Sequence, residues 1–120
     1  MKIYRFDQEV GKHITQFDSS FIMSRVVAAD EPAHIGCMHI KAEGIVGYHK
    51  AVSDQLFLVV AGEGWVRGEE DEKTKIKTGE VAFWEDGEWH ESGTDTGMTA
   101  IVIESTNLDP SIFMPDKDDQ

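Results

Sequence analysis

The sequence is poor in cysteine, in proline and in long apolar segments. Its 120 residues include one cysteine and three prolines. A single thiol cannot form a disulfide within the chain, so we expect a reducing compartment and a cytoplasmic protein. No apolar run approaches the roughly 18 residues that a membrane helix needs, and the charged first residues predict no signal peptide. We therefore expect no membrane partner.

The single cysteine, Cys37, lies in an apolar segment between Ile35 and Met38. A free cysteine behaves as a small hydrophobic residue, and the chain has no second thiol for redox chemistry. The sequence therefore predicts that Cys37 is buried.

Positively charged residues are also scarce. The chain has 11 Lys and Arg against 23 Asp and Glu, which gives a formal net charge of -12. A surface of that sign repels a phosphate backbone, so nucleic acid is not expected as a partner. The length is sufficient for one hydrophobic core and too short for two, so we predict a single domain over residues 1–120.

Short β-prone segments separated by glycine-containing turns make up most of the chain. Roughly eight or nine such segments, with no long helical period, predict an all-β fold, an antiparallel jelly-roll β-barrel. We assign the barrel to residues 21–105. Residues 1–20 are expected to form an N-terminal arm, and residues 106–120 a C-terminal tail.

Two of these segments each carry one histidine beside an apolar run. In residues 44–62, His49 precedes the run that begins at Gln55, and in residues 79–94, His90 follows a run that ends at Trp84. Two strands are therefore each expected to supply one imidazole.

The spacing in these segments resembles the two sequence motifs of the cupin superfamily, over about residues 33 to 105. In the first motif, His49, Gln55 and Gly62 fall on the first histidine, the glutamate and the closing glycine, while Ala51 occupies the position of the second histidine. Gly44 is one residue away from the place of the opening glycine. The resemblance implies a small barrel that holds one metal ion.

The second motif is matched by Gly79, Gly87 and His90 at the family's spacing. Glu85 stands in place of the motif's proline, and Thr94 in place of its asparagine. The family's metal centre uses three histidines and one carboxylate, and this chain departs from that set at two ligands.

Two interpretations of the histidines are open. In the first, His49, Gln55 and His90 hold one divalent ion (Fe, Mn, Ni or Zn) in a site with no charge compensation, because a neutral amide replaces the carboxylate. In the second, the same three residues line the pocket of an organic ligand as neutral hydrogen-bonding groups. Phe57 and Phe83 are expected among the walls of that pocket.

Other titratable residues are less certain members of the site. His39 lies in an expected strand, and alternation alone leaves its direction open between the barrel interior and solvent. Glu104 is either a base inside the barrel or a solvated carboxylate at a strand end. Glu91 follows His90 directly and is expected to face the opposite side.

The expected strand at residues 55–61 is apolar on both faces. The second face needs a cover, which can come from the arm, the tail or another subunit. We expect a homodimer, with coverage by the arm as the alternative.

Three functions are compatible with the sequence. The chain binds a small molecule in the barrel without proven catalysis, or it is a mononuclear metal enzyme of the dioxygenase or isomerase type. A third possibility is that the outer apolar wall is itself the functional surface. No serine lies in a nucleophile motif such as G-x-S-x-G, so covalent hydrolysis is not expected.

Overall fold

The computed structural model describes residues 1–118 and is built almost entirely of β-strands. The only helical segments in this range are three 3₁₀ turns, Gln8–Val10, Gln16–Asp18 and Pro110–Ile112, and none is long and apolar enough to cross a membrane. The strands are β1 (Lys2–Arg5), β2 (Lys12–Ile14), β3 (Phe21–Met23), β4 (His34–Ile40), β5 (Ile45–Lys50), β6 (Asp54–Arg67), β7 (Thr74–Lys77), β8 (Glu80–Trp84), β9 (Trp89–Gly93) and β10 (Met98–Ser105).

Strand β6 belongs to both sheets of the barrel. Its first half pairs with β8 and β10, and its second half pairs with β7 and β9, all antiparallel. The strand bends at Gly62, whose φ is +78°. A Cβ at this position would collide with the carbonyl oxygen of Gly97, so the bend requires glycine.

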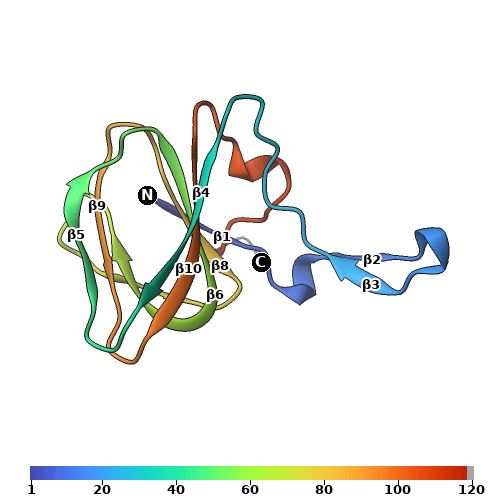
Figure 1. Ribbon diagram of the computed structural model, residues 1–120, viewed down its shortest axis with the longest axis horizontal. Coiled ribbons are helices and arrows are strands. Elements are labelled where there is room, and N and C mark those ends of the chain that lie inside the picture. Colours follow the sequence, from blue (N-terminus) through green and yellow to red (C-terminus); the bar gives the residue numbers. More distant parts are fainter. Residues whose placement is uncertain (119–120) are drawn as a thin grey trace.

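The two sheets face each other around one interior (Figure 1). One sheet has the order β1, β8, β6, β10, β4, and the other has the order β5, β9, β6, β7. Two antiparallel sheets that share a long bent strand form a jelly-roll barrel. The predicted all-β fold class is therefore confirmed.

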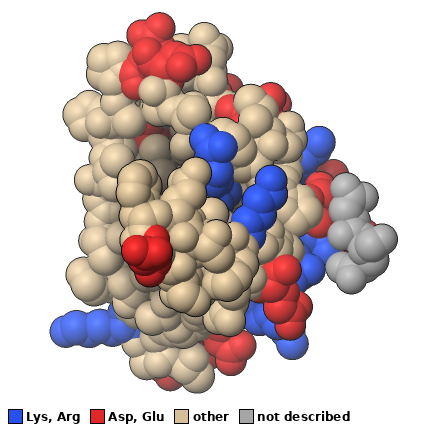
Figure 2. Space-filling model, turned by 90° about the vertical axis from the view of Figure 1, so that its right-hand side faces the viewer, with Lys and Arg blue, Asp and Glu red and all other residues tan. Residues whose placement is uncertain are grey.

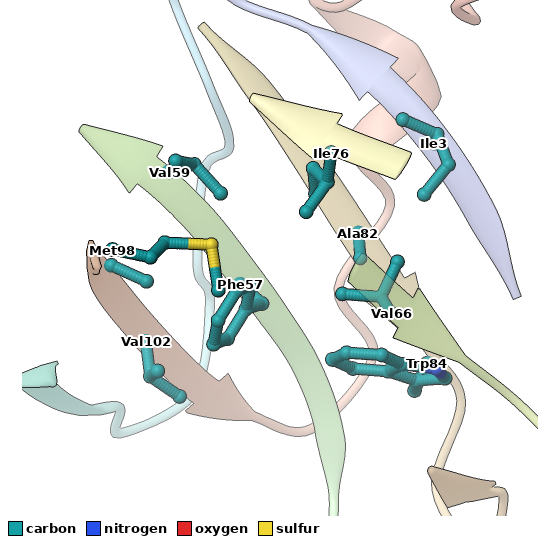
Figure 3. Packing of buried hydrophobic residues seen from close by; sticks show 10 residues of the cluster. Ile3, Phe57, Val59, Val66, Ile76, Ala82, Trp84, Met98 and Val102 are labelled. Atoms are coloured by element: carbon teal, nitrogen blue, oxygen red, sulfur yellow. The ribbon is translucent and has the colours of Figure 1, made fainter. Parts of the chain in front are cut away.

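The barrel interior is filled by apolar side chains from both sheets (Figure 3). Alternation along β6 directs Phe57 and Val59 inward, where they meet Trp84 of β8 and Val66 of the second sheet. A fully buried side chain of this kind contributes about 1.5–3 kcal/mol to stability. The interior cluster consists of Ile3, Phe57, Val59, Val66, Ile76, Ala82, Trp84, Met98, Ala100 and Val102.

The outer face of β6 is also covered, and the cover comes from the chain itself. Leu56 and Leu58 pack with Leu108 and Met114 of the tail and with Tyr4 of β1. The outer face is therefore buried within one protomer at Leu56 and Leu58, whereas Val60 on the same face is 42% exposed. The homodimer stays a prediction.

The first strand of the barrel is β1, not the segment at residues 21–29 that the sequence predicted. Residues 21–29 do not supply a barrel strand, because β3 pairs with β2 in a separate two-stranded sheet that projects from the body (Figure 1). Instead, β1 from the arm pairs with β8 at the edge of the first sheet. The β-prone composition of residues 21–29 predicted a strand, but composition carries no information about the partner of that strand.

The prediction that Cys37 is buried is wrong. Cys37 is exposed on β4, together with Ile35 and His39, while Met38 and Ile40 of the same strand pack against the interior cluster. Strand β4 is the last strand of its sheet, and the arm and tail do not bury the outer side chains Ile35 and Cys37. His39 shares this outer face, so it lies outside the barrel interior.

Candidate functional site

The histidines of the two motifs meet on neighbouring strands. His49 of β5 stands directly opposite His90 of β9, and the centroids of their rings are 4.3 Å apart. His90 is 2% exposed, whereas His49 is open to solvent. The pair lies near the end of the barrel at which β6 begins and β8 and β10 end, which we call the mouth.

Backbone carbonyls hold both imidazoles by the same ring atom. Nδ1 of His49 lies 2.6 Å from the carbonyl oxygen of Gly47, and Nδ1 of His90 lies 3.2 Å from that of Glu88. A carbonyl only accepts, so each Nδ1 carries the proton in the neutral ring and Nε2 keeps its lone pair. This is the arrangement by which proteins fix the tautomer of a histidine that binds through Nε2.

His90 is held in its neutral form. Burial, the largest effect, lowers the pKa of its imidazole; the hydrogen bond to the Glu88 carbonyl opposes this, and the neighbouring His49 lowers the pKa further. Within the described residues, Nε2 of His90 is buried without a hydrogen-bond partner, and so is Nε1 of Trp84. The site therefore presents one buried acceptor and one buried donor, both unused.

Trp84 forms the inner wall of the site. Its ring stacks on His90 with centroids 4.3 Å apart and an angle of 24° between the planes, and it is fully buried. Gln55 stands opposite Trp84 in the ladder between β6 and β8, so both side chains are on the interior face. Phe57 contacts Trp84 edge to face, with centroids 6.0 Å apart.

Phe83 lies on the other side of the sheet from this group. It packs with the outer cluster around Leu56 and Leu58. The aromatic wall beside His90 is therefore Trp84, which adjoins Phe83 in the sequence. Successive residues of a strand alternate in direction, and only the pairing register shows which of the two faces inward.

The register also brings Glu104 to the interior face. Glu104 of β10 is opposite Gln55 of β6 on one side and His34 of β4 on the other. Its neighbour two residues earlier, Val102, belongs to the interior cluster. A row of polar groups thus crosses the mouth from Gln55 to the half-buried Glu104 and the exposed His34.

Glu91 faces outward, as alternation with His90 predicts. Its carboxylate accepts a hydrogen bond from Nε of Arg67 at 2.7 Å, and the guanidinium of Arg67 lies over the ring of Tyr48. Glu91 therefore stabilises the outer wall and does not reach the interior.

The donor set fits a metal ion only in part. The Nε2 atoms of His49 and His90 are free to coordinate, and the amide oxygen of Gln55 is the remaining motif donor. Ala51, at the position of the second motif histidine, is buried and has no donor atom. Among residues 1–118 no group of three or more His, Cys, Asp and Glu side chains is arranged to hold a metal ion.

Two polar side chains fix the loops around the site. The carboxylate of Asp54 accepts hydrogen bonds from the backbone N–H groups of Asp86 and Leu108 at 2.9 and 3.0 Å, which ties the first motif to the second and to the tail. The hydroxyl of Thr94 donates to the carbonyl of Glu63 and accepts from the N–H of Gly97.

Comparison with solved structures supports the family resemblance at the level of fold. The chain is similar to a cupin superfamily protein from Desulfitobacterium hafniense, with 16% identity, a TM-score of 0.59, and coverage of 69% of this chain and 75% of that one. It is similar to a predicted oxalate decarboxylase from Thermotoga maritima, with 24% identity, a TM-score of 0.53, and coverage of 57% and 62%. It also resembles the DMSP lyase DddQ from Ruegeria pomeroyi, with 16% identity, a TM-score of 0.59, and coverage of 87% and 56%.

The chain thus spans under two-thirds of the length of the last two proteins. No protein-family model matches this chain, and no curated protein matches it. At these identities the similarity shows the fold: the chain has the cupin fold, as its two motifs predicted.

Proposed function

We propose that this chain binds a small organic molecule at the mouth of the barrel. The observation that carries the proposal is the pair of unused buried atoms, Nε2 of His90 and Nε1 of Trp84. A buried polar group without a partner costs roughly 1–3 kcal/mol. A ligand that hydrogen-bonds to both atoms recovers this cost on binding.

The chemistry of the lining selects a neutral polar ligand. His90 is an acceptor at Nε2, Trp84 is a donor at Nε1, and the amide of Gln55 can do both. None of the three carries a charge at neutral pH, and the nearby Glu104 disfavours an anion. We expect a molecule with a hydroxyl or amide group directed at His90.

A screen of neutral hydroxylated and amide compounds by thermal shift, followed by calorimetric titration, tests this function. Trp84→Phe keeps the ring and removes the N–H group, so it should weaken binding about tenfold, the equivalent of about 1.4 kcal/mol. Trp89→Phe is the matched control, because Trp89 stacks on Tyr48 and is partly exposed. Equal affinities for the parent and Trp84→Phe would contradict the proposal.

A mononuclear metal enzyme is the second candidate, and the tautomers of the histidines favour it. Both Nδ1–H groups are engaged with backbone carbonyls, which leaves two Nε2 lone pairs on adjacent rings. His49, His90 and Gln55 would hold Fe, Mn, Ni or Zn. Such an ion supplies Lewis acidity toward an oxygen-bearing substrate. Glu104, across the ladder from Gln55, is then the carboxylate that accepts or returns a proton at the mouth.

Elemental analysis of untagged protein, purified without chelator or nickel resin, separates the two candidates. Near-stoichiometric metal that is lost in both His49→Ala and His90→Ala would establish the metal centre. Metal far below one ion per chain would exclude it and leave the organic ligand. Gln55→Glu should raise metal affinity, because a carboxylate supplies the missing negative charge; an unchanged affinity would show that position 55 does not contact the ion.

A further inference from the structure

The carboxylate of Glu104 at the mouth is not bound by any other described residue. Glu104 is half-buried, and its side chain makes no hydrogen bond and no ion pair with residues 1–118. Two other carboxylates of the barrel, those of Asp54 and Glu91, accept hydrogen bonds of 2.7 to 3.0 Å. Partial burial removes water from a carboxylate, and at Glu104 no hydrogen bond within the described chain offsets that cost. A ligand that donates to Glu104 would offset it.

The polar groups of the mouth are mostly acceptors. Gln55 is the ladder partner of Glu104, and its amide offers one oxygen and one NH₂ group. On the facing sheet, His49 and His90 keep the lone pairs of their Nε2 atoms, because Nδ1 of each ring is engaged with a backbone carbonyl. The indole N–H of Trp84 is the remaining donor of this group. A ligand that fits the mouth therefore needs more donors than acceptors.

The barrel is open beside Glu104, between β4 and β5. In the described chain these two strands belong to different sheets and do not pair with each other, and they lie apart at the mouth (Figure 1). Gly36 of β4 has the same direction as Met38, which packs against the interior cluster. A Cβ at Gly36 would nevertheless meet no atom within 4 Å. Gly36 stands opposite Val102, two residues before Glu104, so open space adjoins this carboxylate on the inner side of β4.

The charge of the molecule disfavours an anionic ligand. The formal net charge is -12, and on the side of the hairpin Asp and Glu appear from the top to the bottom of the surface, with Lys and Arg between them (Figure 2). The row of inward residues that includes Glu104 runs across the mouth from His34 to Trp84 and contains no Lys or Arg. An anion that approaches the mouth is therefore repelled both by the whole molecule and by Glu104.

We propose that the ligand at the mouth is a polyol, and that Glu104 selects it by accepting hydrogen bonds from two neighbouring hydroxyl groups. This inference rests on the proposed function, because it assigns a chemical class to the ligand of the same site. The two oxygens of a carboxylate match two hydroxyls on adjacent carbon atoms, each of which donates one hydrogen. A further hydroxyl donates to Nε2 of His90 and accepts from the indole N–H of Trp84.

A hydroxyl suits all of these partners because it both donates and accepts. An ammonium group has no lone pair for the indole N–H of Trp84. A primary amide carries both of its donors on a single nitrogen, so it cannot direct one donor at Glu104 and another at His90 from separate parts of the ligand. The class that satisfies Glu104, His90 and Trp84 together is therefore a compound with several hydroxyl groups.

Matched cyclohexane probes test this selection on the full chain: the vicinal cis-diol, cyclohexanol, cyclohexanecarboxamide and cyclohexylamine. NMR titration that follows backbone and indole N–H signals measures each affinity, and the indole signal of Trp84 is assigned from its absence in Trp84→Phe. We expect the diol to bind at least about tenfold more tightly than cyclohexanol, because it makes an additional hydrogen bond to a charged group. It should also bind more tightly than the amide and the amine.

Two substitutions separate the carboxylate from the space beside it. Glu104→Gln leaves a single acceptor oxygen, so the preference for the diol over cyclohexanol should fall below about threefold. Glu63→Gln is the matched control, because Glu63 is exposed on β6 beside the bend at Gly62, and it should keep the preference of the parent.

Gly36→Val fills the open space and should weaken binding of the diol about tenfold. The fold should tolerate this change, since the new side chain starts in open space and valine is favoured in strands. Cys37→Val is the control on the opposite, outer face of β4, and it should leave binding unchanged. Circular dichroism spectra of all variants should match that of the parent.

The possible failures are distinguishable. Equal affinities for the diol and cyclohexanol, both weakened in Trp84→Phe, would overturn the polyol class and leave the proposed function intact, and so would a preference for the amine or the amide. A diol preference that persists in Glu104→Gln would overturn the role of Glu104. If none of the probes bound to the parent, the proposed function would fail, and this inference with it.

Discussion

At the scale of single residues, the stack of Trp84 on His90 brings two buried polar nitrogen atoms together in the barrel interior. Each ring has one polar nitrogen without a partner among the described residues. The backbone carbonyl of Glu88 leaves His90 with an acceptor atom, while Trp84 offers only a donor. The two atoms therefore complement a group that both donates and accepts.

The neutral state of His90 leads to a prediction about pH. Burial lowers the pKa of this imidazole below 6.5, its ordinary value, so below pH 6.5 the unfolded chain binds a proton that the folded chain takes up less readily. The free energy of unfolding should therefore fall as the pH is lowered from about 7.5 to about 5.5. The loss should be smaller in His90→Gln, which does not titrate.

Urea unfolding at several pH values, with chelator present, measures this difference. His39→Gln is the control, because His39 is exposed on β4, and it should follow the parent. If His90→Gln lost as much stability as the parent over the same interval, His90 would not be the group responsible.

At the scale of elements, the long strand β6 connects the two sheets and brings Gln55 to the mouth. Its first half runs beside β8 and β10, so Trp84 and Glu104 become neighbours of Gln55. Its bend at Gly62 passes the chain into the second sheet, which contains β9 and His90. The position of the site therefore depends on the bend.

Gly62→Ala should destabilise the protein strongly. An L-residue at φ +78° costs about 1–3 kcal/mol, and the added Cβ would also collide with the backbone of Gly97. Gly36→Ala is the matched control, since a Cβ at Gly36 meets no atom within 4 Å, and it should change stability by less than about 1 kcal/mol. The measurement is the urea midpoint of each variant, and similar midpoints would refute this account of the bend.

At the scale of the whole molecule, the barrel and the β2–β3 hairpin differ in how much of their apolar surface is covered. The tail and β1 cover the outer face of β6, where Leu108 and Met114 pack on Leu56. Within residues 1–118, Phe17 of the hairpin and Ile35 on the outer face of β4 stay largely exposed. A homodimer and a cytoplasmic location stay predictions.

Much of the fold was predictable because it depends on local chemistry. Glycines at fixed spacing mark the corners of a barrel, as Gly62 does. The sequence separations between His49 and Gln55 and between Gly87 and His90 match the two cupin motifs. The partner of β3 was not predictable, since a segment of β-prone residues has the same composition whether it joins the barrel or a separate hairpin.

The sequence by itself determined the all-β class, the two histidine-bearing strands and the loss of a donor at Ala51, because each of these is a property of residue type and spacing. Only the tertiary structure decided that Trp84 faces His90 while Phe83 faces away, that Glu104 stands beside Gln55, and that Cys37 is exposed. The reason is the period of two along a strand: the register between strands, set by contacts far apart in the chain, selects which face is inside.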